Sequence, residues 1–153
     1  AYGTLKVRLA HVALVVGDVR GARVVPSGGA CTVEVQVDAQ EAVEELTVGI
    51  LVRDRFGQDV FGTNTYHLGC PLALKAGEKR LVRFHFDEWN IGPGQYTLTV
   101  AAHRADVHYQ GCYQWVDNAV RFETVPAGDF HFVGLARMKP RLEVEGQCRP
   151  SGP

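Results

Sequence analysis

The chain has 153 residues, of which 46% are hydrophobic and 22% charged, and its formal net charge is -1. This length and composition predict one globular domain over residues 1–153 with a core of its own, and they exclude disorder over most of the chain. The nearly balanced charge provides no excess of basic residues to attract the phosphate backbone of a nucleic acid. We therefore expect no nucleic-acid partner.

A membrane-spanning segment is not apparent, because no apolar stretch approaches the roughly 20 residues that a bilayer span requires. The run at residues 12–16 is among the longest. The first residue is Ala1 and the single methionine is Met138. We expect the chain to be one domain of a longer protein.

The cysteines and histidines are too dispersed to predict a metal centre. Cys31, Cys70, Cys112 and Cys148 form no C-x-x-C pair and have no His at the usual zinc-ligand spacing. We expect reduced thiols rather than disulfides, because a chain of this length can fill its own core. No metal or other cofactor is predicted.

Short runs of alternating apolar and polar side chains dominate the sequence, and each run ends at Gly, Pro, Asp or Asn. This pattern is typical of half-buried β-strands, and stretches with a helical period are nearly absent. The spacing of the strands predicts an all-β fold, an immunoglobulin-like antiparallel β-sandwich. The apolar rows lie at residues 5–9, 31–37, 46–52, 60–61, 82–86, 98–102 and 120–122.

Tyr96 follows a Pro-Gly turn and is expected to form a tyrosine corner, in which the hydroxyl bonds to nearby backbone. Linker-like composition is confined to residues 25–29 and 148–153. Segments 130–136 and 141–145 resemble additional C-terminal strands that such a sandwich does not need. We expect part of the region 129–147 to pair elsewhere.

No catalytic constellation is apparent. The two serines, Ser27 and Ser151, lie outside any nucleophile elbow, and no glycine loop has the strand–helix context that holds phosphate. Acidic side chains such as Asp87, Glu88 and Glu44 fall in polar connections, where solvated charge is the simplest interpretation. We predict that the domain is not an enzyme; a glycan-processing carboxylate pair is the weakest alternative.

Three blocks in fixed order and spacing carry a family resemblance. The first contains VGILVRD at residues 48–54 and VFGTNT at 60–65, the second is PGQYTLTV at 93–100, and the third is WVDNAVRF at 115–122. Over residues 46–122 the chain resembles the C-terminal domain of O-antigen polysaccharide ABC transporter ATPases, the Wzt type.

The resemblance implies a carbohydrate-binding domain fused behind a nucleotide-binding ATPase domain, at the cytoplasmic face of a Gram-negative inner membrane. It implies recognition of lipid-linked O-antigen polysaccharide, often through a modified non-reducing end, for export during lipopolysaccharide biosynthesis. Other implied partners are a second copy in a homodimer that exchanges a C-terminal strand and, through the full-length protein, the transmembrane permease subunit. The main alternative is an immunoglobulin-like interaction module that only dimerises the transporter.

Residues of the shared motifs are expected to be structural rather than to bind ligand. Asn64, Thr65, Tyr96 and Trp115 belong to the family pattern although glycans differ between transporters, so we assign them to turn, corner and core. Trp115 is expected to pack beneath a loop. For His108 and Tyr109, in a polar loop, ligand binding and plain exposure both remain open.

The predicted glycan site lies on the outer face of a sheet formed by residues 46–53, 60–66, 96–103 and 119–124. Alternation turns Leu46, Val48, Ile50 and Val52 inward and the residues between them outward. Gly49, Thr99 and Ala101 are small and would leave a shallow trough; the alternative is an ordinary solvated sheet face. The predicted binding residues are Leu51, Arg53, Tyr66, His67, Thr99, His103, His108, Tyr109 and Arg121.

Overall fold

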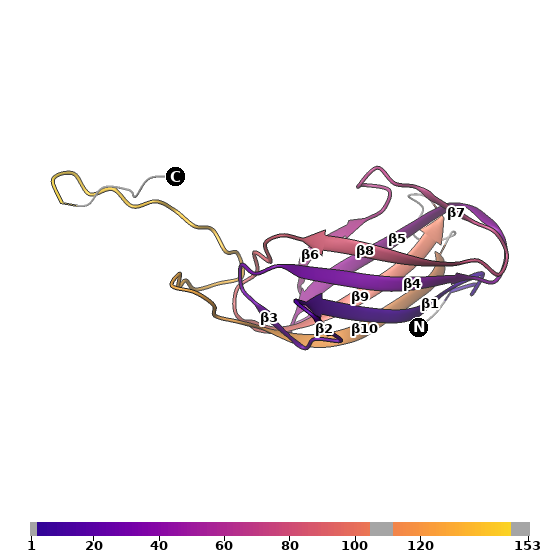
Figure 1. Cartoon of the computed structure of the whole chain (residues 1–153), viewed down its shortest axis with the longest axis horizontal. Helices are drawn as coiled ribbons and strands as arrows, with labels where there is room; N and C mark the ends of the chain where they lie inside the picture. Colours follow the sequence, from indigo (N-terminus) through magenta and orange to yellow (C-terminus); the bar gives the residue numbers. More distant parts are fainter. Residues whose placement is uncertain (1–2, 105–111, 148–153) are drawn as a thin grey trace.

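Two β-sheets pack face to face in the computed structural model, which describes residues 3–104 and 112–147 (Figure 1). One is 4-stranded, in the order β2-β1-β4-β8, and the other is 6-stranded, with the path β3-β10-β9-β5-β6 and with β7 paired to β5. No helix that could cross a membrane occurs in the described residues. The strands are β1 (Val7–Val16), β2 (Val19–Arg20), β3 (Val24–Pro26), β4 (Cys31–Ala39), β5 (Val43–Asp54), β6 (Asp59–Asn64), β7 (Leu72–Leu74), β8 (Lys79–Phe86), β9 (Gly94–Arg104) and β10 (Cys112–Val125).

The predicted alternation is confirmed in both sheets. In β4, Val33, Val35 and Val37 are fully buried, and they face the inner row of β5, in which Val48 and Val52 are fully buried as well. A row of β-branched side chains on one face of each strand suits a pleated, half-buried surface. The two inner faces together form the hydrophobic core, so the all-β prediction is correct.

The predicted sheet is confirmed, because β6, β5, β9 and β10 are consecutive neighbours and each of these pairs is antiparallel. The tyrosine corner is also confirmed. Tyr96 is buried, and its hydroxyl donates a 2.6 Å hydrogen bond to the carbonyl oxygen of Gly92. Burial, together with the nearby Asp54 carboxylate, raises the pKa of Tyr96. The corner fixes the start of β9, and with it the register of the outer face.

The predicted linker at residues 25–29 is wrong. Its first part belongs to β3, an edge strand that runs parallel to β10, and Val25 is fully buried. Ser27 is buried too, and its hydroxyl donates to the carbonyl oxygen of Ile91 at 2.7 Å. The Pro-Ser-Gly-Gly composition suggested a flexible connection, but proline is compatible with an edge strand and the preceding valines favour one.

The two surplus segments, 130–136 and 141–145, form no named strand in the described residues. The first is docked on the chain's own body, since the backbone N–H of Gly92 donates to Leu135 O at 2.7 Å and Ala136 forms a bridge with Ile91. A side chain at Gly92 would overlap the carbonyl oxygen of Gly134, so this approach requires glycine. The chain that follows projects away from the sandwich (Figure 1).

Candidate carbohydrate site on the outer face of the six-stranded sheet

Two rows of outward-facing residues cross the sheet in register. Gly49 pairs with Asn64 on one side and with Ala101 on the other, and Ala101 pairs with Trp115. In the next row Leu51 lies between Gly62 and Thr99. Because side chains alternate along each strand, these residues share one face. The face therefore has small side chains at its centre.

The small residues leave a hollow of about 220 Å³, which we call the tryptophan hollow. Thr99, Ala101 and His103 are buried although they belong to the outward-facing row. A side chain at Gly62 would crowd the Cδ1 atom of Leu51 at 3.1 Å, whereas one at Gly49 would meet its neighbours at an ordinary 3.5 Å. The hollow is lined by Gly49, Ile50, Leu51, Gly62, Thr63, Asn64, His67, Thr99, Val100, Ala101, His103 and Trp115.

A bulge in β10 lies next to this hollow. Val116 pairs with Val100 and Val120 pairs with Leu98, so residues 117–119 oppose the single residue Thr99. Asn118 adopts a left-handed conformation with φ 52°. Asn tolerates this region better than other residues with side chains, and bulges redirect side chains at functional sites. Here the bulge brings Asp117 over the outer face.

The Asp117 carboxylate organises the surrounding side chains. Its Oδ1 atom accepts hydrogen bonds from Trp115 Nε1 at 2.9 Å, from Arg53 Nη1 at 3.2 Å and from Thr99 Oγ1 at 3.3 Å. Arg53 also donates through Nε to Asp59 at 3.0 Å. Hydrogen bonds with a charged partner are stronger than neutral ones, so Asp117 fixes the edge of the Trp115 indole relative to the sheet.

A second hollow, of about 520 Å³, lies beyond Asp117 on the same sheet. We call it the arginine hollow. Its lining is more polar than that of the tryptophan hollow, and three of its residues are arginines. The residues that line it are Arg53, Asp54, Arg55, Gly57, Gln95, Tyr96, Thr97, Asp117, Asn118 and Arg121.

The structure brings most of the predicted binding residues to these two hollows. Leu51, His67, Thr99 and His103 line the tryptophan hollow, and Arg53 and Arg121 line the arginine hollow. Tyr66 lines neither; it is 48% exposed in the turn after β6, where its ring meets the ring of His67 edge-on. His108 and Tyr109 lie outside the described residues.

Trp115 and Asp117 are the residues that sequence reasoning missed. Trp115, which was expected to pack beneath a loop, is half-buried and lines the tryptophan hollow. The signal was the pair Asp117-Asn118 in the middle of a strand pattern, because both residue types are depleted in strands and favour local backbone irregularity. Thr65, in contrast, is structural as predicted: it is buried and accepts the backbone N–H of Val48.

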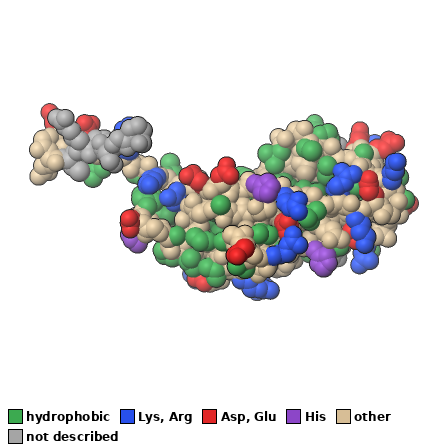
Figure 2. Space-filling view, in the orientation of Figure 1, with side chains coloured by type: hydrophobic (Ala, Val, Ile, Leu, Met, Phe, Trp, Pro, Cys, Tyr) green, Lys and Arg blue, Asp and Glu red, His purple; other side chains and the backbone are tan. Residues whose placement is uncertain are grey.

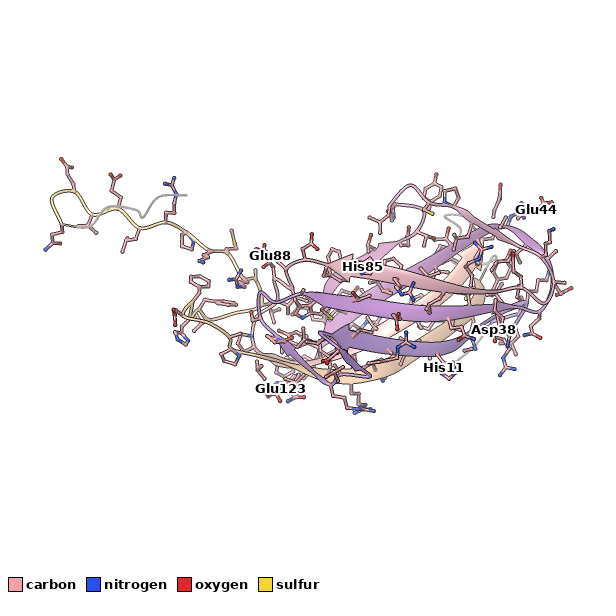
Figure 3. The ribbon with its side chains drawn as sticks, viewed as in Figure 1. His11, Asp38, Glu44, His85, Glu88 and Glu123 are labelled. Carbon is pink, nitrogen blue, oxygen red and sulfur yellow. The ribbon has the colours of Figure 1, made fainter. Side chains whose placement is uncertain are left out.

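Catalytic alternatives gain no support from the placement of acidic and thiol groups. Glu44 and Glu88 lie at opposite ends of the sandwich (Figure 3). Burial raises the pKa of the Cys31 thiol to about 11, and it also raises that of Cys112, so neither is a ready nucleophile at neutral pH. Within the described residues, no three His, Cys, Asp or Glu side chains converge to hold a metal ion.

The outer face of the four-stranded sheet has a different character. Glu34 lies on it with only 6% exposure and forms ion pairs with Arg20 and, at 2.8 Å, with Arg83. The hydrogen bond from Arg83 is the largest of the interactions that lower the pKa of Glu34. Basic and acidic side chains are interspersed over this face (Figure 2). Long paired side chains thus cover the positions that small residues occupy on the other sheet.

Comparison with known proteins assigns the fold to a family. A search of curated proteins finds no match. Among solved structures, the crystal structure of the C-terminal domain of Wzt matches with a TM-score of 0.82 at 13% sequence identity, covering 94% of this chain and 86% of that one. The CARDB domain of a Pyrococcus furiosus protein is more distant, with a TM-score of 0.47 at 13% identity over 82% of this chain and 94% of that one.

The family model of the Wzt C-terminal domain matches residues 1–138 of this chain. The match includes every described strand and all residues of the two hollows. The chain belongs to the Wzt C-terminal domain family.

Proposed function

We propose that this domain is a non-catalytic carbohydrate-binding module that recognises lipid-linked O-antigen polysaccharide, through its non-reducing end, for export by an ABC transporter. The observation that carries the proposal is the tryptophan hollow. It combines an indole held by Asp117 with a floor of small residues and a rim that includes Asn64 and His67. Sugar rings are bound by aromatic faces together with a few oriented polar groups, which is the composition found here.

Family membership supports the proposed setting. The domain acts at the cytoplasmic face of the inner membrane as part of a longer ATPase subunit and works with a transmembrane permease subunit. Selection of the polysaccharide needs no bond to be broken, and Glu44 and Glu88, two of the acidic residues considered for an enzyme, lie far apart (Figure 3).

The proposal is tested by calorimetric titration of the domain with O-polysaccharide from the bacterium that encodes it. We expect saturable binding without release of sugar products. Trp115→Ala should weaken binding by about 30-fold, the scale of an aromatic hot spot, whereas Trp115→Phe should retain most of the affinity because it keeps an aromatic face. Absence of binding by the unaltered domain would contradict the proposal, and product release would favour the enzyme alternative.

A second role, homodimerisation, is favoured by the C-terminal arm, residues 138–147. Met138 and Leu142 are 75% and 66% exposed, and Leu142 and Val144 alternate with Glu143 and Glu145 as in a half-buried strand. A segment with this pattern can pair with the exposed edge of another sheet. Because residues 134–137 are docked on their own body, the segment proposed for exchange is 141–145 rather than 130–136.

The proposed acceptor is the groove between β6 and β8, which end their respective sheets. The groove has a volume of about 500 Å³, and Phe61, Leu72 and Phe84 are among its lining residues. Arg80 and Arg83 also line it, and they complement the acidic residues of the arm. A second copy of the chain would place its Leu142 and Val144 here.

Sedimentation of truncated chains tests this proposal. A chain ending at Lys139 keeps the docked segment 134–137 and should sediment as a monomer, whereas a chain ending at Gln147 should remain a dimer. A chain ending at Gly128 loses the docked segment as well and should be monomeric or insoluble. A stable dimer from the chain ending at Lys139 would exclude strand exchange as the basis of assembly.

A further inference from the structure

The arginine hollow contains two arginines placed symmetrically about a threonine. Thr97 pairs with Arg53 on β5 and with Arg121 on β10, so the three residues form one row across the sheet. Neighbouring strands are about 4.8 Å apart, which places the backbones of the two arginines about 10 Å from each other. The short Thr97 side chain lies between them and lines the hollow, and we call the space above it the slot.

The acidic residues of this hollow are occupied by internal partners. Asp54 Oδ1 accepts the backbone N–H groups of Phe56 and Gln58, both at 2.9 Å. Asp117 Oδ1 accepts the bonds from Trp115, Thr99 and Arg53 described above, and Arg53 is further neutralised by Asp59. These contacts hold both carboxylates in place, and the ion pairs of this region centre on Arg53.

Arg121 is exposed and lies at the opposite side of the slot from Arg53. Over residues 3–104 and 112–147, no ion pair involves its guanidinium. Arg55, on the same hollow, has its guanidinium 4.6 Å from the ring centroid of Phe56. Arg53 is thus paired with carboxylates, whereas the Arg121 guanidinium is exposed to a ligand on the face where the glycan is proposed to bind.

We infer that the slot above Thr97 binds an acidic group of the glycan, a carboxylate or a phosphate, with Arg121 as its principal ligand. This inference rests on the proposed function and adds the chemical class of the substituent. A guanidinium presents its N–H donors in a planar fork that matches a carboxylate or a phosphate. A neutral sugar hydroxyl accepts fewer of these hydrogen bonds and carries no charge to strengthen them. Asn118, held in the bulge beside the slot, contributes an amide at the same hollow.

One glycan can occupy both hollows. Thr97 and Thr99 are two positions apart on β9 and face the same side, which corresponds to about 7 Å along the strand. Asp117 lies between the hollows, because it lines the arginine hollow and bonds to Trp115 and Thr99 of the other. A sugar ring against Trp115 would therefore hold an acidic substituent of the same or the adjoining residue over Thr97.

The test compares three forms of the O-polysaccharide from the encoding bacterium: intact, carboxyl-reduced, and treated with hydrofluoric acid to remove phosphate. Each is titrated into the unaltered chain, into Arg121→Gln and into Arg8→Gln, whose arginine is exposed on the opposite sheet. With intact polysaccharide, Arg121→Gln should bind about tenfold more weakly, the scale of a charge-assisted hydrogen bond, and Arg8→Gln should be unchanged.

The form that has lost its acidic group should bind the unaltered chain as weakly as Arg121→Gln binds the intact one, and Arg121→Gln should no longer distinguish the two. The treatment that weakens binding identifies the group as carboxylate or phosphate. The inference is overturned, while the proposed function stands, if the unaltered chain binds all three forms with equal affinity. It is also overturned if Arg121→Gln weakens the binding of each form by the same factor. If no form binds, both fail.

Discussion

The outer faces of the two sheets are built on the same alternation but differ in side-chain size. On the four-stranded sheet, Glu34 is held between Arg20 and Arg83, and Thr32 is bonded to His85 at 2.9 Å, so long side chains satisfy one another across the strands. On the six-stranded sheet, Gly49, Gly62 and Ala101 leave a hollow that Asp117 and Trp115 border. Pairing of polar side chains covers the first face, whereas missing side-chain volume provides the second with room for a ligand.

Filling the tryptophan hollow should have the largest effect on glycan binding. Gly49→Leu adds a side chain that points into the hollow from a strand where a Cβ has ordinary contacts. Binding of O-polysaccharide should fall by about 100-fold or more, because the ligand would lose a whole subsite. The thermal midpoint should change little, since glycine contributes weakly to a strand. Ala10→Leu, at an exposed position of β1, is the matched control and should bind normally.

Removing the carboxylate that borders the hollow should have the next largest effect. Asp117→Ala leaves Trp115 Nε1, Thr99 Oγ1 and Arg53 Nη1 without their common acceptor. We expect about tenfold weaker binding in calorimetry and a loss of about 1–2 kcal/mol in the free energy of unfolding. Asp117→Asn keeps an acceptor and should recover part of both losses. Unchanged affinity in Asp117→Ala would show that the orientation of Trp115 does not matter.

A substitution on the outer face of the four-stranded sheet should change the stability of the domain but not its glycan binding. Glu34→Gln weakens the ion pairs with Arg20 and Arg83 and should lower the free energy of unfolding by about 1–3 kcal/mol, with glycan binding unchanged.

The pH dependence of the free energy of unfolding gives a second measure of the contribution of Glu34. The pKa of Glu34 is lower in the folded state than in the unfolded state. The contribution of Glu34 to stability is therefore complete above the unfolded-state pKa, and it is lost as the pH falls through the folded-state pKa. Denaturation curves between neutral and acidic pH should therefore be less steeply pH-dependent in Glu34→Gln. An identical acid dependence in both proteins would contradict this assignment.

The smallest effect is expected at Tyr66, which the sequence placed among the binding residues. Its side chain is 48% exposed and lines neither hollow. Tyr66→Ala should change affinity by about twofold at most, as expected for a surface position away from the ligand. A loss comparable to that of Trp115→Ala would extend the site toward the turn after β6.

The sequence predicted the sandwich well because its signal is local. Period-two rows such as Val48, Ile50 and Val52 determine which face is buried, and the same alternation placed Gly49, Thr99 and Ala101 on the outside. The bulge at residues 117–119 could not be derived in the same way, because it inserts two residues that keep the alternation of β10 but change which residues of β9 they oppose. Asp117 was therefore not placed beside Thr99, and Trp115 was assigned a structural role because it belongs to the shared motif. The docking of Leu135 against Gly92 likewise depends on distant backbone geometry rather than on local pattern.

The central claim, that polysaccharide binds over Trp115, is tested most directly by quenching of tryptophan fluorescence. The chain has two tryptophans, and Trp89 is 1% exposed, so acrylamide should quench mainly Trp115. In Trp89→Phe, where Trp115 is the remaining indole, saturating O-polysaccharide should reduce the quenching constant severalfold. In Trp115→Phe, the buried Trp89 should show little quenching with or without ligand. Polysaccharide that binds Trp89→Phe with unaltered affinity and leaves Trp115 equally accessible to acrylamide would contradict the account.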